Sequence, residues 1–119
     1  MDRKEFARGI AFFNRAEFFE AHEVLEDIWR ASPPENKKHL QGLVQVAVAF
    51  HHYSTGNRVG MRSVLERALK NLNGYPNHLG GIRCELLMGS LRDWLAALDQ
   101  RQPLPPLPQI EIHTAESDD

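Results

Sequence analysis

The sequence predicts an all-α protein, a single bundle of about five helices followed by an extended tail. Apolar residues recur every three or four positions, start and stop signals separate the periodic segments, and no stretch alternates polar and apolar residues as a half-buried strand does. A chain of 119 residues, 42% of them hydrophobic, can form one core but not two. We therefore expect a helical domain over residues 1–100 and a proline-rich tail over residues 101–119.

Capping signals and apolar periodicity define the first two helices. Asp2 followed by Glu5 fits a capping box, which begins a helix that ends near Asn14. A second helix is expected over residues 17–31, with Val24 on its solvent side. The residues expected on the buried sides of the two helices are Phe6, Ile10, Phe13, Phe18, Ala21, Leu25, Ile28 and Trp29.

The third helix is expected to be the central one. Ser32 is a suitable cap, prolines follow it in the first turn, and Glu35 stands three residues after the cap. From there the helix continues to about Thr55. Apolar residues cover most of its circumference, as expected of a helix that is buried on nearly all sides. These residues are Leu40, Leu43, Val44, Val46, Ala47, Phe50 and Tyr53.

Two further helices complete the predicted bundle. Asn57 can cap a fourth helix, which ends before the NGYP turn at residues 73–76. A fifth is expected over residues 81–99, with Leu86 among its buried residues. The tripeptide VLE occurs at residues 24–26 and again at 64–66, each time after an aromatic helix end and a tight turn. This weak repeat favours helical hairpins like those of tetratricopeptide repeats.

The tail is expected to be extended. Its prolines, Pro103, Pro105, Pro106 and Pro108, are too closely spaced for a helix. Apolar residues between and after them could lie along the bundle. The acidic end, residues 116–119, is expected to be frayed.

Composition narrows the classes of function. A formal net charge of −2 lacks the basic excess typical of nucleic-acid binders, and no apolar run approaches the roughly 20 residues that span a bilayer. We therefore expect neither a nucleic acid nor a membrane as partner. The first residues lack the apolar region of a signal peptide, and the single Cys84 cannot form a disulfide within the chain. Both observations favour a cytoplasmic location.

Polar residues interrupt the apolar pattern of the second helix. A helical wheel places His22 at the margin of the apolar side and Glu26 between His22 and Phe19, so the imidazole and the carboxylate can touch. Glu23 lies further round, near Arg30. We expect the carboxylate of Glu26 to be desolvated by its apolar neighbours.

A second set of polar residues forms one narrow stripe on the third helix, and it includes Gln41, Gln45 and His52. An unpaired buried amide costs about 1–3 kcal/mol, so these side chains need partners. A buried ring of five residues would satisfy every member. Its members are His22, Glu26, Gln41, Gln45 and His52.

The segments FFEAHEVLEDIWR and QGLVQVAVAFHHYSTGN, with the amphipathic helix that follows, resemble the domain of unknown function 309 family over about residues 5–72. The resemblance implies a small all-helical protein and the general label of a predicted metal-dependent hydrolase. A departure is Met61-Arg62 after Gly60, where the family pattern has Gly-Ala. The positions that match the family pattern, and to which the implied functional role applies, are His22, Glu23, Glu26, Trp29, Gln41, Gln45 and Asn57.

Three hypotheses of function remain open at this point. One is a pocket without a metal, in which Glu26 acts as acid and base and the two glutamines orient a polar ligand. In a metal-dependent hydrolase, His22, Glu26 and His52 would hold a divalent metal ion with one position left for water, and Glu23 would act as a base. Catalysis would then rest on His22, Glu23 and Glu26, and the pocket for a small-molecule ligand on Gln41, Gln45, His52, Trp29 and Asn57. Alternatively, the polar cluster is a structural network in a helical module that binds a protein partner or a second copy of the chain. The two glutamines suit such a network better than a metal shell.

Overall fold

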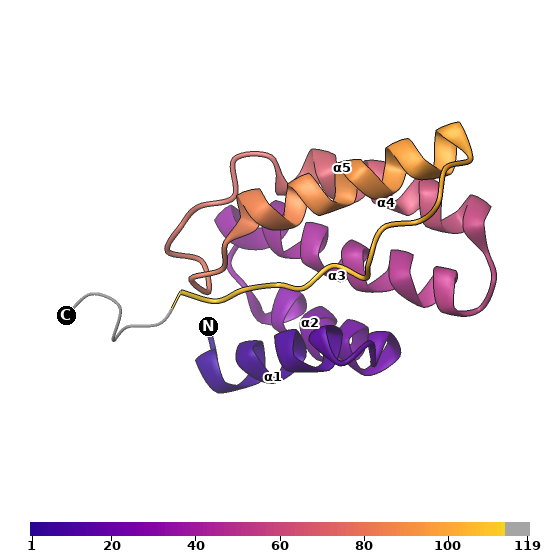
Figure 1. Ribbon diagram of the computed structural model, residues 1–119. Coiled ribbons are helices and arrows are strands. Elements are labelled where there is room, and N and C mark those ends of the chain that lie inside the picture. The colour runs from indigo at the N-terminus through magenta and orange to yellow at the C-terminus, as the bar shows by residue number, and fades with distance from the viewer. Residues whose placement is uncertain (114–119) are drawn as a thin grey trace.

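The computed structural model describes residues 1–113 and contains five helices joined by short connections (Figure 1). The predicted all-α bundle is confirmed. The acidic end, for which fraying is predicted, lies outside the described residues. The helices are α1 (Arg3–Asn14), α2 (Phe18–Ala31), α3 (Pro34–Ser54), α4 (Arg58–Leu72) and α5 (Cys84–Gln100).

Two of the predicted caps are confirmed and one is wrong. The side chain of Asp2 accepts a hydrogen bond from the amide of Glu5, and the side chain of Asn57 accepts one from the amide of Gly60. Ser32 does not cap α3. Its hydroxyl donates to the carbonyl of Trp29 at 2.7 Å, so Ser32 ends α2 instead, and α3 begins without a side-chain cap.

The third helix is central, as predicted. α3 packs extensively against both α2 and α4, while α1 packs against α2 and α5 against α4 (Figure 1). Gly42 allows α3 and α4 to approach closely, since a Cβ at this position would lie 2.8 Å from the Cδ2 atom of the buried Leu72. The helices therefore form layers, with α1 and α2 on one side of α3 and α4 and α5 on the other.

Aromatic rings fill the core where α3 meets its neighbours. The ring of Phe50 lies 5.9 Å from Phe13, 5.7 Å from Phe18 and 5.1 Å from Trp94, measured between ring centroids. Tyr53 adds an edge contact to Trp94 at 5.1 Å. Rings from α1, α2, α3 and α5 thus meet in one cluster, which fixes the positions of these four helices relative to one another.

Two positions, Val24 and Leu86, differ from the helical-wheel prediction. A helix with one buried side would turn Val24 to solvent. α1 packs on that side of α2, so Val24 is buried. Phe19 and Leu86 are exposed, at 51% and 54% of their surface. A wheel identifies the sides of a helix, but the number of neighbouring helices decides how many of those sides are buried.

Residues 102–113 run back along the bundle in an extended conformation (Figure 1). The indole Nε1 of Trp94 donates to the carbonyl of Pro106 at 3.0 Å, and the side chain of Asn14 pairs with both backbone polar groups of Ile110. Ile110 is 2% exposed. An isolated antiparallel bridge joins Ile112 to Ile82, and this pairing replaces the start predicted for the fifth helix.

A helix that crosses a bilayer must be both long and apolar along its whole length. Among residues 1–113, no helix combines the length and the apolar character that a membrane span needs.

Candidate functional site

The polar motif of α2 forms a ladder of paired side chains along one face of the helix. His22 Nε2 lies 3.3 Å from Glu26 Oε2, and Arg30 Nη2 donates to Glu26 Oε1 at 2.7 Å. The spacing of four residues places successive members one turn apart, so the contact of His22 with Glu26 agrees with the prediction. Both side chains remain about 30% exposed, however. The prediction that apolar neighbours desolvate Glu26 is therefore wrong, because its carboxylate stays partly exposed and is paired with a guanidinium.

The predicted buried ring is not formed. Gln45 Oε1 accepts from Asn71 of α4 at 2.8 Å, and His52 Nδ1 lies 3.4 Å from the amide nitrogen of Asn57 at the start of α4. Gln41 is exposed, and no polar or charged residue among residues 1–113 is buried. The polar stripe of α3 thus faces α4, whereas the ladder belongs to α2. The two sets of polar residues belong to different helix contacts.

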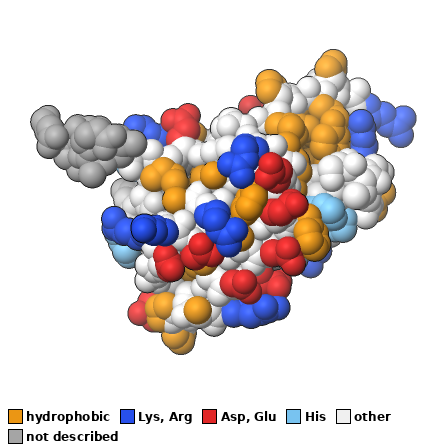
Figure 2. Space-filling view, turned by 90° about the horizontal axis from the view of Figure 1, so that it is seen from below, with side chains coloured by type: hydrophobic (Ala, Val, Ile, Leu, Met, Phe, Trp, Pro, Cys, Tyr) orange, Lys and Arg blue, Asp and Glu red, His pale blue; other side chains and the backbone are white. Residues whose placement is uncertain are grey.

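Glu23 also lies apart from the ladder. It lines a shallow hollow of about 280 Å³ between α1 and α2, together with Arg8, Phe12, Glu20, Val24 and Asp27. Arg30 pairs with Glu26 and Asp27 rather than with Glu23. Figure 2 views the molecule from the α1–α2 side, where acidic and basic side chains intermingle over the surface. Glu23 thus lies on the side of α2 that faces α1, whereas His22 pairs with Glu26.

The contacts of Trp29 stabilise the carboxyl end of α2. The ammonium of Lys37 lies 4.9 Å from the centroid of the indole ring and donates to the carbonyl of Trp29 at 2.6 Å and to that of Arg30 at 2.9 Å. A cation at the carboxyl end of a helix is stabilised by the helix dipole and satisfies free carbonyl groups. The indole Nε1 is buried and has no partner among residues 1–113.

His51 is part of the surface beside the ladder, although the helical pattern did not single it out. The exposed ring of Phe19 lies 6.3 Å from the ring of His22 and 5.7 Å from that of His51, between centroids. We call the group of Phe19, His22, Glu26 and His51 the Phe19 surface. The signal that could have identified His51 is the pair His51-His52 in the last turn of α3. Adjacent side chains lie roughly 100° apart around a helix, so a His52 that faces α4 leaves His51 directed toward a different neighbour.

The residues expected to hold a metal do not fit one. Within the described part of the chain, no three His, Cys, Asp or Glu side chains are grouped so that they could share a metal ion. His22 and Glu26 contact each other, Glu26 is also held by Arg30, and His52 contacts Asn57. The three predicted ligands therefore do not converge, because α2 and the polar stripe of α3 face different neighbours.

Exchanging Glu26 for glutamine tests how the ladder contributes to stability. We expect Glu26→Gln to lower the free energy of unfolding by no more than about 1 kcal/mol, because pairs between partly exposed charges contribute little. Urea denaturation and elemental analysis of wild type and variant, both purified without a histidine tag, would measure the effect. If wild type contains bound metal and the variant loses it while its helices stay intact, that result would instead support the metal-site hypothesis.

Cys84 is a poor nucleophile in this fold. Burial raises the pKa of its thiol to about 11, with a smaller contribution from the neighbouring charge of Glu85. Alkylation by iodoacetamide at a pH of about 8 should therefore be slow in the native protein and fast after denaturation, because the reactive species is the thiolate. Mass spectrometry after timed labelling measures the ratio. Equal rates in the two states would show that Cys84 is accessible and its thiolate readily formed.

The family model described as "Domain of unknown function (DUF309)" matches residues 6–64, from α1 into the first half of α4. An uncharacterized protein of Aquifex aeolicus is 32% identical over 84 residues, which are 70% of this chain and 24% of that protein. The uncharacterized protein YpuF of Bacillus subtilis is 31% identical over 64 residues, 53% of this chain and 37% of that protein. The chain thus spans a minor part of both relatives. The motif-bearing helices and the family match over them identify this chain as a member of the DUF309 family.

Proposed function

We propose that this protein is a helical protein-interaction module that binds its partner through the Phe19 surface. The observation that carries the proposal is the placement of Phe19, a large apolar ring that is half exposed and flanked by two imidazoles. Aromatic residues with polar neighbours are typical anchors of protein interfaces, because they bury a large apolar area when the partner covers them. The Glu26 ladder beside the ring supplies charged groups for a polar rim.

The lengths of the relatives support a modular role. The matched regions make up 24% and 37% of the two relatives, so in both of them the segment similar to this chain is joined to further sequence. A small helical unit that recurs within longer chains is suited to binding another protein or another part of the same chain.

The hydrolase implied by the family resemblance has less support in the geometry. A metal-dependent hydrolase needs about three converging ligands and an open coordination position. The residues predicted for that role are distributed over two helix contacts, and their donor atoms already have partners. We therefore propose binding rather than catalysis.

A photo-crosslinker placed in the Phe19 surface tests the proposal. We expect p-benzoylphenylalanine at position 19 to capture a defined protein in the native host, whereas the same group at the equally exposed position of Leu86 on α5 should not capture it. The captured protein, once purified, should bind wild type and the Leu86→Ser variant with equal affinity in isothermal titration calorimetry. Phe19→Ser should bind about tenfold or more weakly. Equal binding by Phe19→Ser would refute the Phe19 surface as the interface.

A further inference from the structure

A groove between α4 and the end of α5 carries a set of side chains that the Phe19 surface does not involve. The groove has a volume of about 800 Å³ and lies on the other side of α3 from α2 (Figure 1). α5 packs against α4 less extensively than α3 does, which leaves the groove open. Its lining residues are Arg58, Val59, Arg62, Ser63, Glu66, Ala97, Leu98, Arg101 and Gln102.

One of the three arginines has a structural role. The guanidinium of Arg62 bridges the two helices, because it donates to both carboxylate oxygens of Asp99 on α5 and to Glu66 on α4. These contacts raise the pKa of Arg62 and lower that of Asp99, in both cases mainly through their mutual hydrogen bond. Arg62 is therefore neutralised by its partners and fixes the geometry of the groove.

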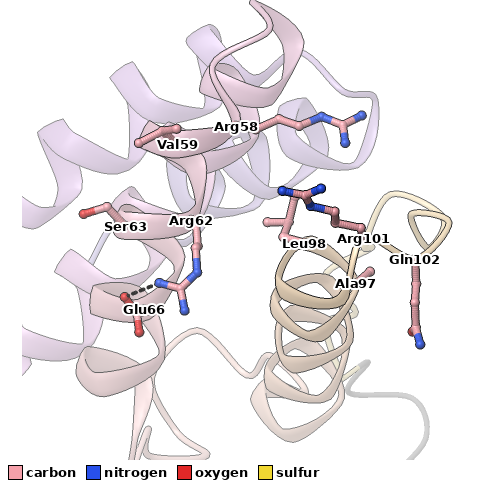
Figure 3. Close-up of a pocket in the computed structure, with 9 residues that line it drawn as sticks. All are labelled: Arg58, Val59, Arg62, Ser63, Glu66, Ala97, Leu98, Arg101 and Gln102. Atoms are coloured by element: carbon pink, nitrogen blue, oxygen red, sulfur yellow. Dashed lines mark hydrogen bonds and ion pairs between the residues drawn. The ribbon is translucent and has the colours of Figure 1, made fainter.

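The other two arginines have no such partner among residues 1–113. Neither Arg58 nor Arg101 forms an ion pair with a residue in the described range. Figure 3 shows both side chains extending over the gap between α4 and the end of α5. The groove thus presents two positive charges that no ion pair with a described residue neutralises, in a chain whose net charge is −2.

The positions of these two arginines are not explained by local stability. Arg58 is the first residue of α4, where the positive end of the helix dipole disfavours a cation, and the first turn contains no acidic residue to offset it. Arg101 caps α5 in the left-handed conformation with φ of 53°, which normally favours glycine. Residues that go against helix-capping and charge preferences, gathered at one place on a surface, indicate a functional site there.

Apolar side chains lie among the charges. Val59 is 85% exposed although it is β-branched and apolar, and the partly exposed Leu98 contributes further apolar surface from α5. A small phosphorylated ligand would pair with the arginines but leave this apolar surface in water. A protein segment with acidic and apolar side chains would match both features of the groove.

We propose that the α4–α5 groove binds an acidic, amphipathic segment of a protein partner. Carboxylates of the segment pair with Arg58 and Arg101, and an apolar side chain between them covers Val59 and Leu98. An amphipathic helix that lies in a groove binds in this way, with its apolar side in the groove. The proposal goes beyond the Phe19 surface and does not depend on it, since it concerns other helices and a partner of stated charge.

Selection from a random peptide library displayed on phage tests the proposal. The full chain is used as bait, as wild type and as the double variant Arg58→Gln, Arg101→Gln. Arg92→Gln is the matched control, because Arg92 is an exposed arginine of α5 that does not line the groove. We expect wild type and Arg92→Gln to enrich the same peptides, rich in Asp and Glu around Leu, Ile or Phe. The double variant should bind the selected peptides about tenfold more weakly.

Two further measurements distinguish peptide binding from a stabilising role of Arg101 in the helix cap and from a site for small anions. Arg101→Gly should raise the thermal midpoint, because glycine suits the left-handed cap, while it weakens peptide binding about threefold. ATP and pyrophosphate should not compete with the peptide at about millimolar concentration. The proposal would be overturned by an absence of enrichment, by enrichment of peptides without acidic residues, by unchanged binding to the double variant, or by efficient competition from the small anions.

Discussion

Trp94→Ala is expected to lower the free energy of unfolding by about 3–5 kcal/mol, the usual cost of removing a large aromatic side chain from a core. Trp94 is 1% exposed and lies 5.1 Å from the rings of both Phe50 and Tyr53. Its indole also donates to the carbonyl of Pro106, so the substitution removes the contact that holds the extended segment to α5. Urea denaturation followed by far-ultraviolet circular dichroism measures the loss.

Trp29→Ala provides the matched comparison for that measurement. Trp29 is only partly buried, and its indole nitrogen has no partner among residues 1–113. Its removal should therefore cost clearly less than the removal of Trp94. If the two variants lose equal stability, the aromatic cluster around Phe50 is not the centre of the core.

Gly80→Ala is the second substitution with a large expected effect, a loss of about 2–4 kcal/mol. A Cβ at this position would overlap the ring of Phe6, which is buried and cannot move aside easily. The backbone of Gly80 has φ of 75°, which an alanine side chain also disfavours. Steric overlap and backbone strain therefore add at one residue.

The neighbouring glycine separates these two contributions. Gly81 has φ of 65°, and no atom lies within 4 Å of the position that a Cβ would occupy there. Gly81→Ala should therefore show the backbone strain alone, about 1 kcal/mol. Chemical denaturation of the two variants gives both values. Equal losses would mean that the ring of Phe6 moves aside without losing packing, contrary to its burial.

The helices themselves were predictable because their signals are local. Caps at Asp2 and Asn57, a proline in the first turn of α3 and the apolar period of each segment act within a few residues, and the structure contains the five helices that they predict. The contact between His22 and Glu26 was predictable for the same reason, since residues four apart on a helix are always neighbours.

Contacts between helices were harder to predict. The wheel correctly grouped Gln45 and His52 on one side of α3, but it could not show that this side faces Asn71 and Asn57 of the next hairpin rather than α2. The buried ring and the three-ligand metal site both depended on that direction. The exposure of Phe19 and the burial of Val24 likewise depended on where α1 and α3 lie around α2.

By itself, the sequence determined the helices, their order and the contact of His22 with Glu26 on α2, because contacts within one helix depend mainly on spacing along the chain. Only the tertiary structure decided which faces meet. That choice is made by the summed packing of side chains from several helices, such as the cluster of Phe13, Phe18, Phe50 and Trp94, and it has no counterpart in any single segment. The α4–α5 groove is a consequence of the same packing, since Arg58 and Arg101 come from helix ends that only the fold brings together.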